Sequence, residues 1–283
     1  MSLVKKDEWW EETRNFKKTV KEEYLDINET LAELENNSSV IRLELNTIEL
    51  PLFSKDPKRI KNQIKIYHFK TDKSSYLEIE APANYSIPGE FEERVFIALT
   101  KIMKNNNYSR SFVVSANEIL ETLGLSNKAY YKRIREALTL LSKTNYTFLN
   151  SLYSNKESGI IEKKIMSSIM NITIISKKDS RAKEIEAFED GRIKEVYEIN
   201  FTDYFYENII RKGYLAFDSG KLLAIENSVS RAIYTIVEKW RGYDLYIKRQ
   251  AFFIARRIPL KWDKTQIKRT IDTMEKALIE LRN

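Results

Sequence analysis

Residues 115–143 read SANEILETLGLSNKAYYKRIREALTLLSK, and this stretch decides the fold. Its first serine, Ser115, is followed three residues later by a glutamate, which is the spacing of a capping box at the start of a helix. Gly124 then supplies the residue type that most often ends a helix. A short helix over residues 116–123 is therefore predicted, with a tight turn behind it.

A second, longer helix is predicted to follow the turn, with Ser126 as its cap and its end near residue 143. Its apolar side chains recur at intervals of three and four residues and would face a core: Tyr131, Ile134, Leu138 and Leu141. Residues 126–143 also hold five basic residues and one acidic residue, and the bases lie largely opposite the apolar stripe. Two helices joined by a short turn, the second with a basic outer side, are typical of a helix-turn-helix.

The neighbouring segments complete the element order of a winged helix. Phe91, Val95, Leu99 and Ile102 recur at helical spacing, so residues 90–104 are predicted as a helix, and a brief strand is predicted over 112–114. Beyond the longer helix, apolar and polar residues alternate over 147–153 and 160–175. The turn-rich insert 155–159 between these two runs predicts a hairpin.

The N-terminal and middle segments predict three further features, namely a helical extension, several strands and a boundary between domains. Val20, Tyr24, Ile27, Leu31 and Leu34 are spaced like a heptad seam within the charged residues 5–35. A helix with this seam either pairs with a second chain or packs on its own domain. Short strands are predicted over 40–82, and the polar residues 176–194 are predicted as an exposed connection between two domains.

The C-terminal part repeats the earlier order weakly. A helical stripe (Val229, Ile233, Ile236, Trp240) precedes a predicted strand over 245–247, a helix over 248–258, and a last helix with its own stripe (Ile267, Ile271, Met274, Leu278, Leu281). A shift of 136 positions places Tyr131-Lys132-Arg133 on Ile267-Lys268-Arg269. The repeat indicates either duplication of a unit or the ordinary similarity of amphipathic helices.

The predicted fold class is therefore α+β, with two winged-helix domains in tandem behind an N-terminal helical extension. The predicted limits are 1–36 for the charged N-terminal helix, 40–178 for the first winged-helix domain and 195–283 for the second. The second domain is expected to be truncated before its wing, or to lack one, because the sequence stops at Asn283 directly after the last helix.

Charge indicates the kind of partner. The sequence holds 48 Lys and Arg against 41 Asp and Glu, a net charge of +7. Residues 1–35 hold ten acidic and six basic residues, so the remainder carries +11. A basic body of this kind attracts polyanions, although solvated helix faces alone would give the same composition.

The candidate DNA-binding residues fall into three groups. For reading bases, Asn127 and Gln266 are candidates for adenine, and Arg133 and Arg269 for guanine. The first helix-turn-helix supplies Ser126, Asn127, Lys128, Lys132, Arg133 and Arg135; the predicted wing supplies Lys156, Lys163 and Lys164; the C-terminal unit supplies Arg256, Arg257, Lys261, Lys264, Thr265, Gln266, Lys268 and Arg269.

Motifs for catalysis are scarce in this sequence. Histidine occurs once, at His68, there is no cysteine, and no glycine-rich phosphate loop is present. We therefore expect no enzyme, no catalytic residue, no cofactor and no metal site, with a nuclease built from scattered carboxylates as the alternative. The absence of cysteine, of a secretory leader and of a long apolar run leads us to expect a cytoplasmic protein.

Residues 85–99, YSIPGEFEERVFIAL, resemble the start of the first winged helix in plasmid replication initiators, especially the replication initiator protein A group. The resemblance extends through residues 130–141 and more loosely to the C-terminal unit, covering residues 40–283. It implies tandem winged helices that bind repeated double-stranded sites at an origin and help to open adjacent AT-rich duplex. It also implies recruitment of host replication proteins and a homodimer that represses its own promoter. A winged-helix transcriptional regulator without a replication role is the alternative.

Overall fold

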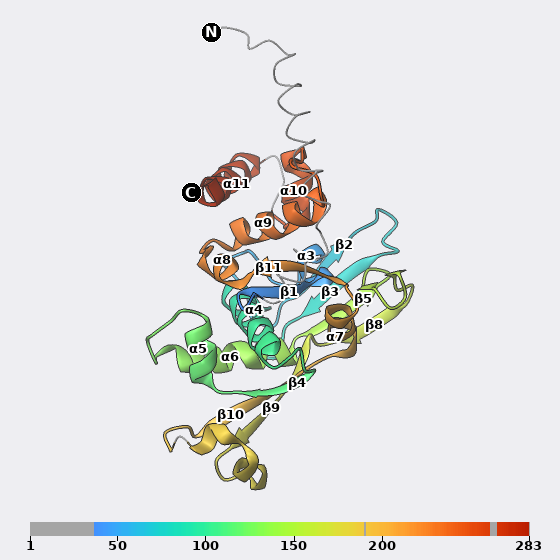
Figure 1. Ribbon diagram of the computed structural model, residues 1–283. Coiled ribbons are helices and arrows are strands. Elements are labelled where there is room, and N and C mark those ends of the chain that lie inside the picture. Colours follow the sequence, from blue (N-terminus) through green and yellow to red (C-terminus); the bar gives the residue numbers. More distant parts are fainter. Residues whose placement is uncertain (1–36, 190, 261–264, 283) are drawn as a thin grey trace.

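The computed structural model describes residues 37–189, 191–260 and 265–282. The predicted N-terminal helix, with its seam from Val20 to Leu34, lies outside the described residues, as do Lys261 and Lys264. The described chain is a mixed α+β fold, as predicted, in which helices pack on small antiparallel sheets (Figure 1).

The quoted stretch folds into two helices, which lie beside a third helix and a three-stranded sheet. Helix α4 (Glu90–Asn105) begins after Gly89, whose backbone N–H donates to Glu92 Oε2 at 2.6 Å. The chain continues through β4 (Ser111–Val114), α5 (Ala116–Thr122) and α6 (Tyr130–Lys143) in the predicted order. Strand β10 (Glu195–Phe201) pairs antiparallel with β4 on one side and with β9 (Met170–Ser176) on the other.

The helices bury the stripes that the sequence predicts. The side chains of Phe91, Val95, Leu99 and Ile102 on α4, and of Ile134, Leu138 and Leu141 on α6, are all buried. Helix α6 packs on α4, α5 and β9. The hydrophobic spacing of this unit is therefore confirmed by its packing.

The hairpin predicted after α6 is confirmed, and it belongs to a second sheet. This sheet has the order β2-β3-β5-β8, with the bounds Ile64–His68, Tyr76–Glu80, Asn145–Leu149 and Lys164–Ser167. The two arms of the hairpin pair with each other, β5 with β8 and, next to the turn-rich insert 155–159, β6 (Tyr153–Ser154) with β7 (Gly159–Ile160). Only the last part of the second predicted strand, from Met170, leaves this hairpin and forms β9.

The hairpin beside α6 lies where the sequence predicted a connection between domains. Strands β9 and β10 pair from Met170 with Phe201 to Ser176 with Glu195, so residues 177–194 form the end of this hairpin. The end contains two short 3-10 helices, Ser180–Glu184 and Glu186–Glu189. It also has its own small apolar cluster of Ile175, Ala182, Phe188 and Val196.

A further pairing joins the two halves of the sequence. Strand β1 (Val40–Glu44) pairs antiparallel with β11 (Tyr214–Asp218). The main hydrophobic cluster accordingly runs from Ile41 to Leu223. Helices α3 (Leu45–Glu49), α7 (Asp203–Ile210) and α8 (Ser219–Ala224) lie in this body of the molecule. The apolar residues of the described chain therefore form one main cluster up to Leu223, a small one in the β9–β10 hairpin and a third after Leu223. The domain limits stay a prediction.

Three helices form the C-terminal group: α9 (Ser228–Arg241), α10 (Ala251–Arg257) and α11 (Ile267–Arg282). A separate cluster of Val229, Ile233, Ile258 and Ala277 holds them together. The strand predicted over 245–247 is wrong, because the structure assigns no strand to these residues. In Figure 1 this group lies at the top of the molecule and the β9–β10 hairpin at the bottom.

The stripe predicted for α11 is only partly buried. Met274 is buried, as are Thr270 and Ala277 beside it, whereas Ile267, Ile271 and Leu278 are 38%, 37% and 50% exposed. The buried side of α11 is thus rotated away from the centre of its apolar stripe. Small side chains at 270 and 277 allow α9 to approach that side closely.

Candidate nucleic-acid interface

The turn between α5 and α6 places the N-terminal end of α6 at the surface. Ser115 Oγ accepts from the Glu118 N–H at 3.1 Å, so the predicted cap of α5 is confirmed. Gly124 has a φ of +70°, a conformation that glycine adopts without strain. The predicted cap at Ser126 is wrong, because α6 begins at Tyr130 and the Ala129 N–H donates to Asn127 Oδ1 at 2.9 Å. This asparagine turn replaces a helical turn over residues 127–129.

All six residues predicted from the first helix-turn-helix are exposed. They differ in whether their side chains already contact another side chain of the protein. The Arg133 guanidinium lies 4.1 Å from the centre of the Phe91 ring, and Arg135 pairs with Glu195 at 3.4 Å. The side chains of Lys128 and Lys132 make no ion pair or hydrogen bond with any described residue. Lys128 just before α6 and Lys132 on its first turn are therefore available cations at the N-terminal end of this helix.

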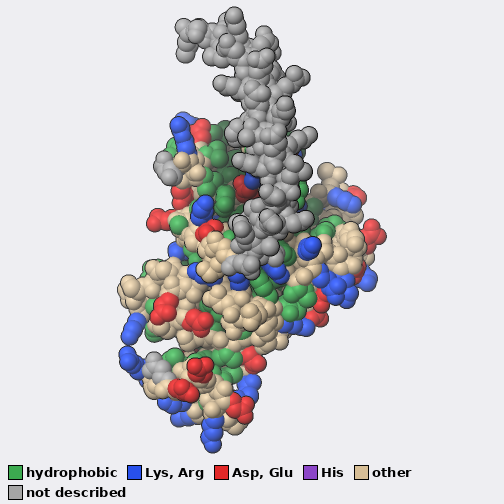
Figure 2. Space-filling model, viewed as in Figure 1, with side chains coloured by type: hydrophobic (Ala, Val, Ile, Leu, Met, Phe, Trp, Pro, Cys, Tyr) green, Lys and Arg blue, Asp and Glu red, His purple; other side chains and the backbone are tan. Residues whose placement is uncertain are grey.

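The β9–β10 hairpin adds a second set of basic side chains beside α6. Lys177, Lys178, Lys183 and Lys194 are exposed near its end, and none pairs with a carboxylate of the described chain. Figure 2 shows basic side chains, mixed with acidic ones, around this end at the bottom of the molecule. Sequence reasoning missed this hairpin because residues 177–194 are mostly polar. The available signal was the pair of alternating segments that flank them, Met170–Ser176 and Glu195–Phe201.

The lysines predicted as wing residues lie on the predicted hairpin. Lys164 is on the edge strand β8, with Lys163 just before it, and Lys156 is in the β6–β7 turn. That turn is bound to α7 and its end, since the Asn155 N–H donates to Asn208 Oδ1 at 2.9 Å. Figure 1 shows α7 and β8 on the opposite side of the view from α5. The structure therefore separates these three lysines from α5.

The C-terminal candidates are also divided by the structure. Thr265, Lys268 and Arg269 are exposed on or just before the first turn of α11, and Gln266 is half-buried. Arg256 is exposed, with its guanidinium 5.0 Å from the centre of the Phe252 ring. Lys261 and Lys264, as noted, lie outside the described residues.

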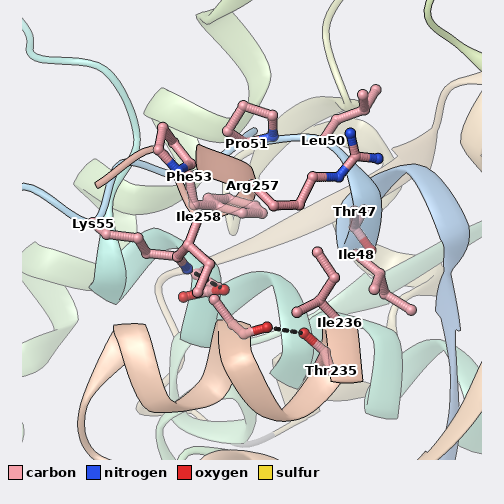
Figure 3. A pocket seen from close by; sticks show the side chains of 13 residues that line it. Thr47, Ile48, Leu50, Pro51, Phe53, Lys55, Thr235, Ile236, Arg257 and Ile258 are labelled. Carbon is pink, nitrogen blue, oxygen red and sulfur yellow. Dashed lines mark hydrogen bonds and ion pairs between the residues drawn. The ribbon is translucent and has the colours of Figure 1, made fainter. Parts of the chain in front are cut away.

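Arg257 points into the junction between the C-terminal helices and the body. Its guanidinium pairs with Glu49 on α3, and its burial lowers its pKa. Figure 3 shows its side chain extended toward Thr47 and Leu50 in a small pocket at this junction. Arg257 is therefore half-buried and paired at this junction, while its contact with DNA stays a prediction.

Buried ion pairs fix the C-terminal helices on the body. Arg231 of α9 is 1% exposed and pairs with Glu93 of α4 at 2.9 Å, while Lys55 pairs with the other oxygen of Glu93 at 2.6 Å. Arg231 also donates to the carbonyl oxygens of Leu222 (3.1 Å) and Ile225 (2.7 Å). Desolvation lowers the pKa of Lys55. A charge buried this deeply needs such partners, so this junction is specific.

Comparison with known proteins places this arrangement in a family. Residues 42–249 match the family described as Replication initiator protein A, a match of 208 of the 283 residues. No curated protein matches the chain.

Two solved structures share the fold. A selenomethionine derivative of domains 2 and 3 of RctB aligns with a TM-score of 0.53 and 12% identity, over 82% of this chain and 83% of that one. A second structure of RctB domains 2–3 aligns with a TM-score of 0.50 and 14% identity, over 82% and 80%. At these identities the likeness concerns the fold alone. Because the family match extends from β1 through α9 and covers far more than half of the sequence, the chain belongs to the replication initiator protein A family.

Proposed function

We propose that this protein initiates plasmid replication by binding repeated double-stranded DNA sites at an origin and promoting the opening of adjacent duplex. Family membership supports the replication role. The observation that carries DNA binding is the pair of uncommitted lysines at the start of α6, Lys128 in the preceding turn and Lys132 in the helix, together with further uncommitted lysines on the adjacent hairpin. The proposal gives the protein no catalytic step.

The element order β4, α5, α6, β9 and β10 supports a winged-helix mode of binding. In a helix-turn-helix the N-terminal part of the second helix contacts base edges, and surrounding cations fix the register through phosphates. Helix α6 would then lie in the major groove with Lys128 and Lys132 near its entrance. The β9–β10 hairpin would contact the flanking backbone as the wing.

The first turn of α11 is the second proposed contact, through Lys268 and Arg269. Both residues are exposed, and α11 follows α10 as α6 follows α5. Figure 1 places α11 and the β9–β10 hairpin at opposite ends of the molecule. Two separated contact surfaces suit a protein that follows a long or repeated site rather than a single short one.

The binding test compares matched pairs of lysines. We expect Lys128→Ala/Lys132→Ala to weaken binding to the repeats of the native origin at least tenfold and to lower the salt slope of binding by about 2, because each phosphate contact contributes roughly 0.9. The control, Lys163→Ala/Lys164→Ala, removes the same charge from β8 and should leave the slope almost unchanged. Fluorescence anisotropy at several salt concentrations measures both. Equal effects of the two pairs would mean that α6 has no special role.

A separate experiment distinguishes an initiator from a regulator. An initiator is required for copying, so the α6 variant should fail to maintain a plasmid that carries the native origin. Loss of promoter repression with normal plasmid maintenance would instead indicate the regulator. Permanganate reactivity of thymines beside the repeats tests duplex opening, and incubation of labelled origin DNA with Mg²⁺ should yield no cleavage.

A further inference from the structure

Exposed apolar side chains are concentrated on the C-terminal helical group. Sixteen large apolar side chains are exposed in the described chain, and seven of them follow residue 240. These seven are Tyr243, Tyr246, Phe253, Ile267, Ile271, Leu278 and Ile279. Figure 2 shows apolar side chains at the surface near α10 and α11. Concentrated apolar exposure of this kind commonly marks an interaction surface.

The apolar flank of α11 is continuous. Ile267, Ile271 and Leu278 recur at intervals of four and seven residues, so they form one strip along the helix. The strip lies beside the side of α11 that packs on α9, where Met274 is buried. The flank therefore offers a narrow apolar strip to a second amphipathic segment.

The strip has a basic side chain near its N-terminal end and an acidic one near its middle. Lys268 stands one helical turn before Ile271, and Glu275 stands one turn after it. Lys248, Arg249 and Arg256 are exposed on or before α10, the helix that packs on α11. Charge complementarity at the N-terminal end of the strip therefore favours an acidic partner with a single apolar stripe.

The N-terminal segment of the same chain has this composition. Residues 1–35 hold ten acidic and six basic residues. Their apolar residues at 20, 24, 27, 31 and 34 recur at intervals of four and three, the spacing of one helical face. The segment thus combines a net negative charge with an apolar periodicity that matches the strip on α11.

The described chain also begins close to α11. Ser39 Oγ donates to Asp218 Oδ2 at 2.7 Å, and the Ser219 N–H donates to Ser39 O at 2.8 Å. Helix α8 starts at Ser219 and has six residues, about 9 Å at 1.5 Å per residue. Just beyond its end, the Glu226 N–H donates to Glu280 of α11 at 2.8 Å.

We propose that residues 1–36 dock in cis on the apolar flank of α11, with their acidic side chains toward the basic residues around it. The segment is tethered one short helix away from the C-terminal turn of α11. Its effective concentration at the strip is therefore about millimolar, so a contact of low affinity is enough to keep it docked. A second copy of the chain is the alternative occupant. The docking does not depend on DNA binding.

Site-specific labelling tests the docking, because the chain has no cysteine. Asn28→Cys/Glu275→Cys places one dye on the segment and one on α11. Asn28→Cys/Lys183→Cys is the control, with its second dye on the hairpin at the other end of the molecule. We expect high energy transfer in the first pair only, at nanomolar concentration and independent of concentration. Equal transfer in both pairs overturns the proposal, and so does transfer that arises only when singly labelled chains are mixed.

Matched substitutions test the two surfaces. Leu31→Asp changes a seam residue and should reduce the transfer to the level of the control pair, whereas Thr30→Asp, which lies off the seam, should leave it unchanged. Ile271→Gln/Leu278→Gln should have the same effect as Leu31→Asp, with Ile174→Gln on the hairpin as its control and circular dichroism to confirm folding. Undiminished transfer in Leu31→Asp and in Ile271→Gln/Leu278→Gln contradicts docking on this strip.

One consequence rests on the proposed function. A segment docked beside Lys268 would compete with DNA phosphates, so Leu31→Asp should raise the affinity for origin DNA by roughly three- to tenfold at low salt. Unchanged affinity despite lost energy transfer would refute the competition. Absence of DNA binding in the unchanged protein would instead refute the proposed function and leave the docking result intact.

Discussion

The two helix-turn-helix groups follow similar sequence patterns but are stabilised differently. The first group, α4, α5 and α6, buries complete apolar stripes in the main hydrophobic cluster and carries a hairpin next to its second helix. The second, α9, α10 and α11, has a small cluster of its own and leaves much of the α11 stripe exposed. A buried ion pair joins it to α4 and a half-buried one joins it to α3. Similar periodicity can therefore produce helices buried in the main core or helices with a small cluster that ion pairs attach to the body.

The largest expected effect tests this attachment. Arg231→Ala leaves one Glu93 oxygen and two carbonyl oxygens without their buried donor, and removal of one partner of a buried pair costs about 3–5 kcal/mol. Urea denaturation measures the loss in free energy of unfolding. The control is Arg211→Ala, which removes an exposed pair with Glu207 and should cost less than about 1 kcal/mol. A small effect of Arg231→Ala would show that the C-terminal helices are held by other contacts.

Equivalent substitutions in the apolar stripes of α6 and α11 should have different effects on stability. Ile134→Ala on α6 removes a side chain with no exposure, so we expect a loss of about 2–4 kcal/mol. Ile271→Ala on α11 removes one that is 37% exposed, and we expect less than about 1 kcal/mol. Thermal or urea denaturation distinguishes the two. Comparable losses would mean that the α11 flank is covered as completely as the α6 stripe.

The salt dependence of DNA binding should distinguish Lys268 and Arg269 from Arg257. Lys268→Ala/Arg269→Ala is expected to weaken origin binding about tenfold, or about 1.4 kcal/mol, and to flatten its salt dependence. Arg257→Ala removes a cation that pairs with Glu49, so it should lower stability and leave the salt slope of binding unchanged. Anisotropy titrations at several salt concentrations measure both slopes. A flatter slope in Arg257→Ala would return this residue to the DNA surface.

The smallest expected effect concerns the two arginines that lie over phenylalanine rings. Arg133 is 4.1 Å from the Phe91 ring centre and Arg256 is 5.0 Å from that of Phe252. A cation–π contact contributes roughly 0.5–1 kcal/mol at exposed sites, so Arg133→Ala should destabilise slightly more than Arg256→Ala. Precise thermal melts of both variants test this order. The reverse order would show that ring distance does not govern the contribution here.

Much of the local structure follows from the sequence. The stripes of α4 and α6, the cap at Ser115 and the short hairpin around residues 155–159 were all predicted and confirmed. These features depend on residues near one another in the chain, where spacing and turn chemistry act directly. The charge surplus and the family resemblance also came from the sequence, and the family match confirms the resemblance.

Tertiary structure decided which strands pair, which apolar stripe is fully buried and which basic side chains remain without a partner in the described chain. Backbone hydrogen bonds in a ladder carry no residue identity, so alternation in residues 170–176 could not reveal a partner at 195–201. Arg257 and Lys268 look alike as basic residues of the C-terminal group, yet Glu49 on distant α3 binds one and leaves the other exposed. The physical reason is common to both cases: periodicity fixes which side of an element is apolar, while its neighbours in space fix what that side and its charges contact.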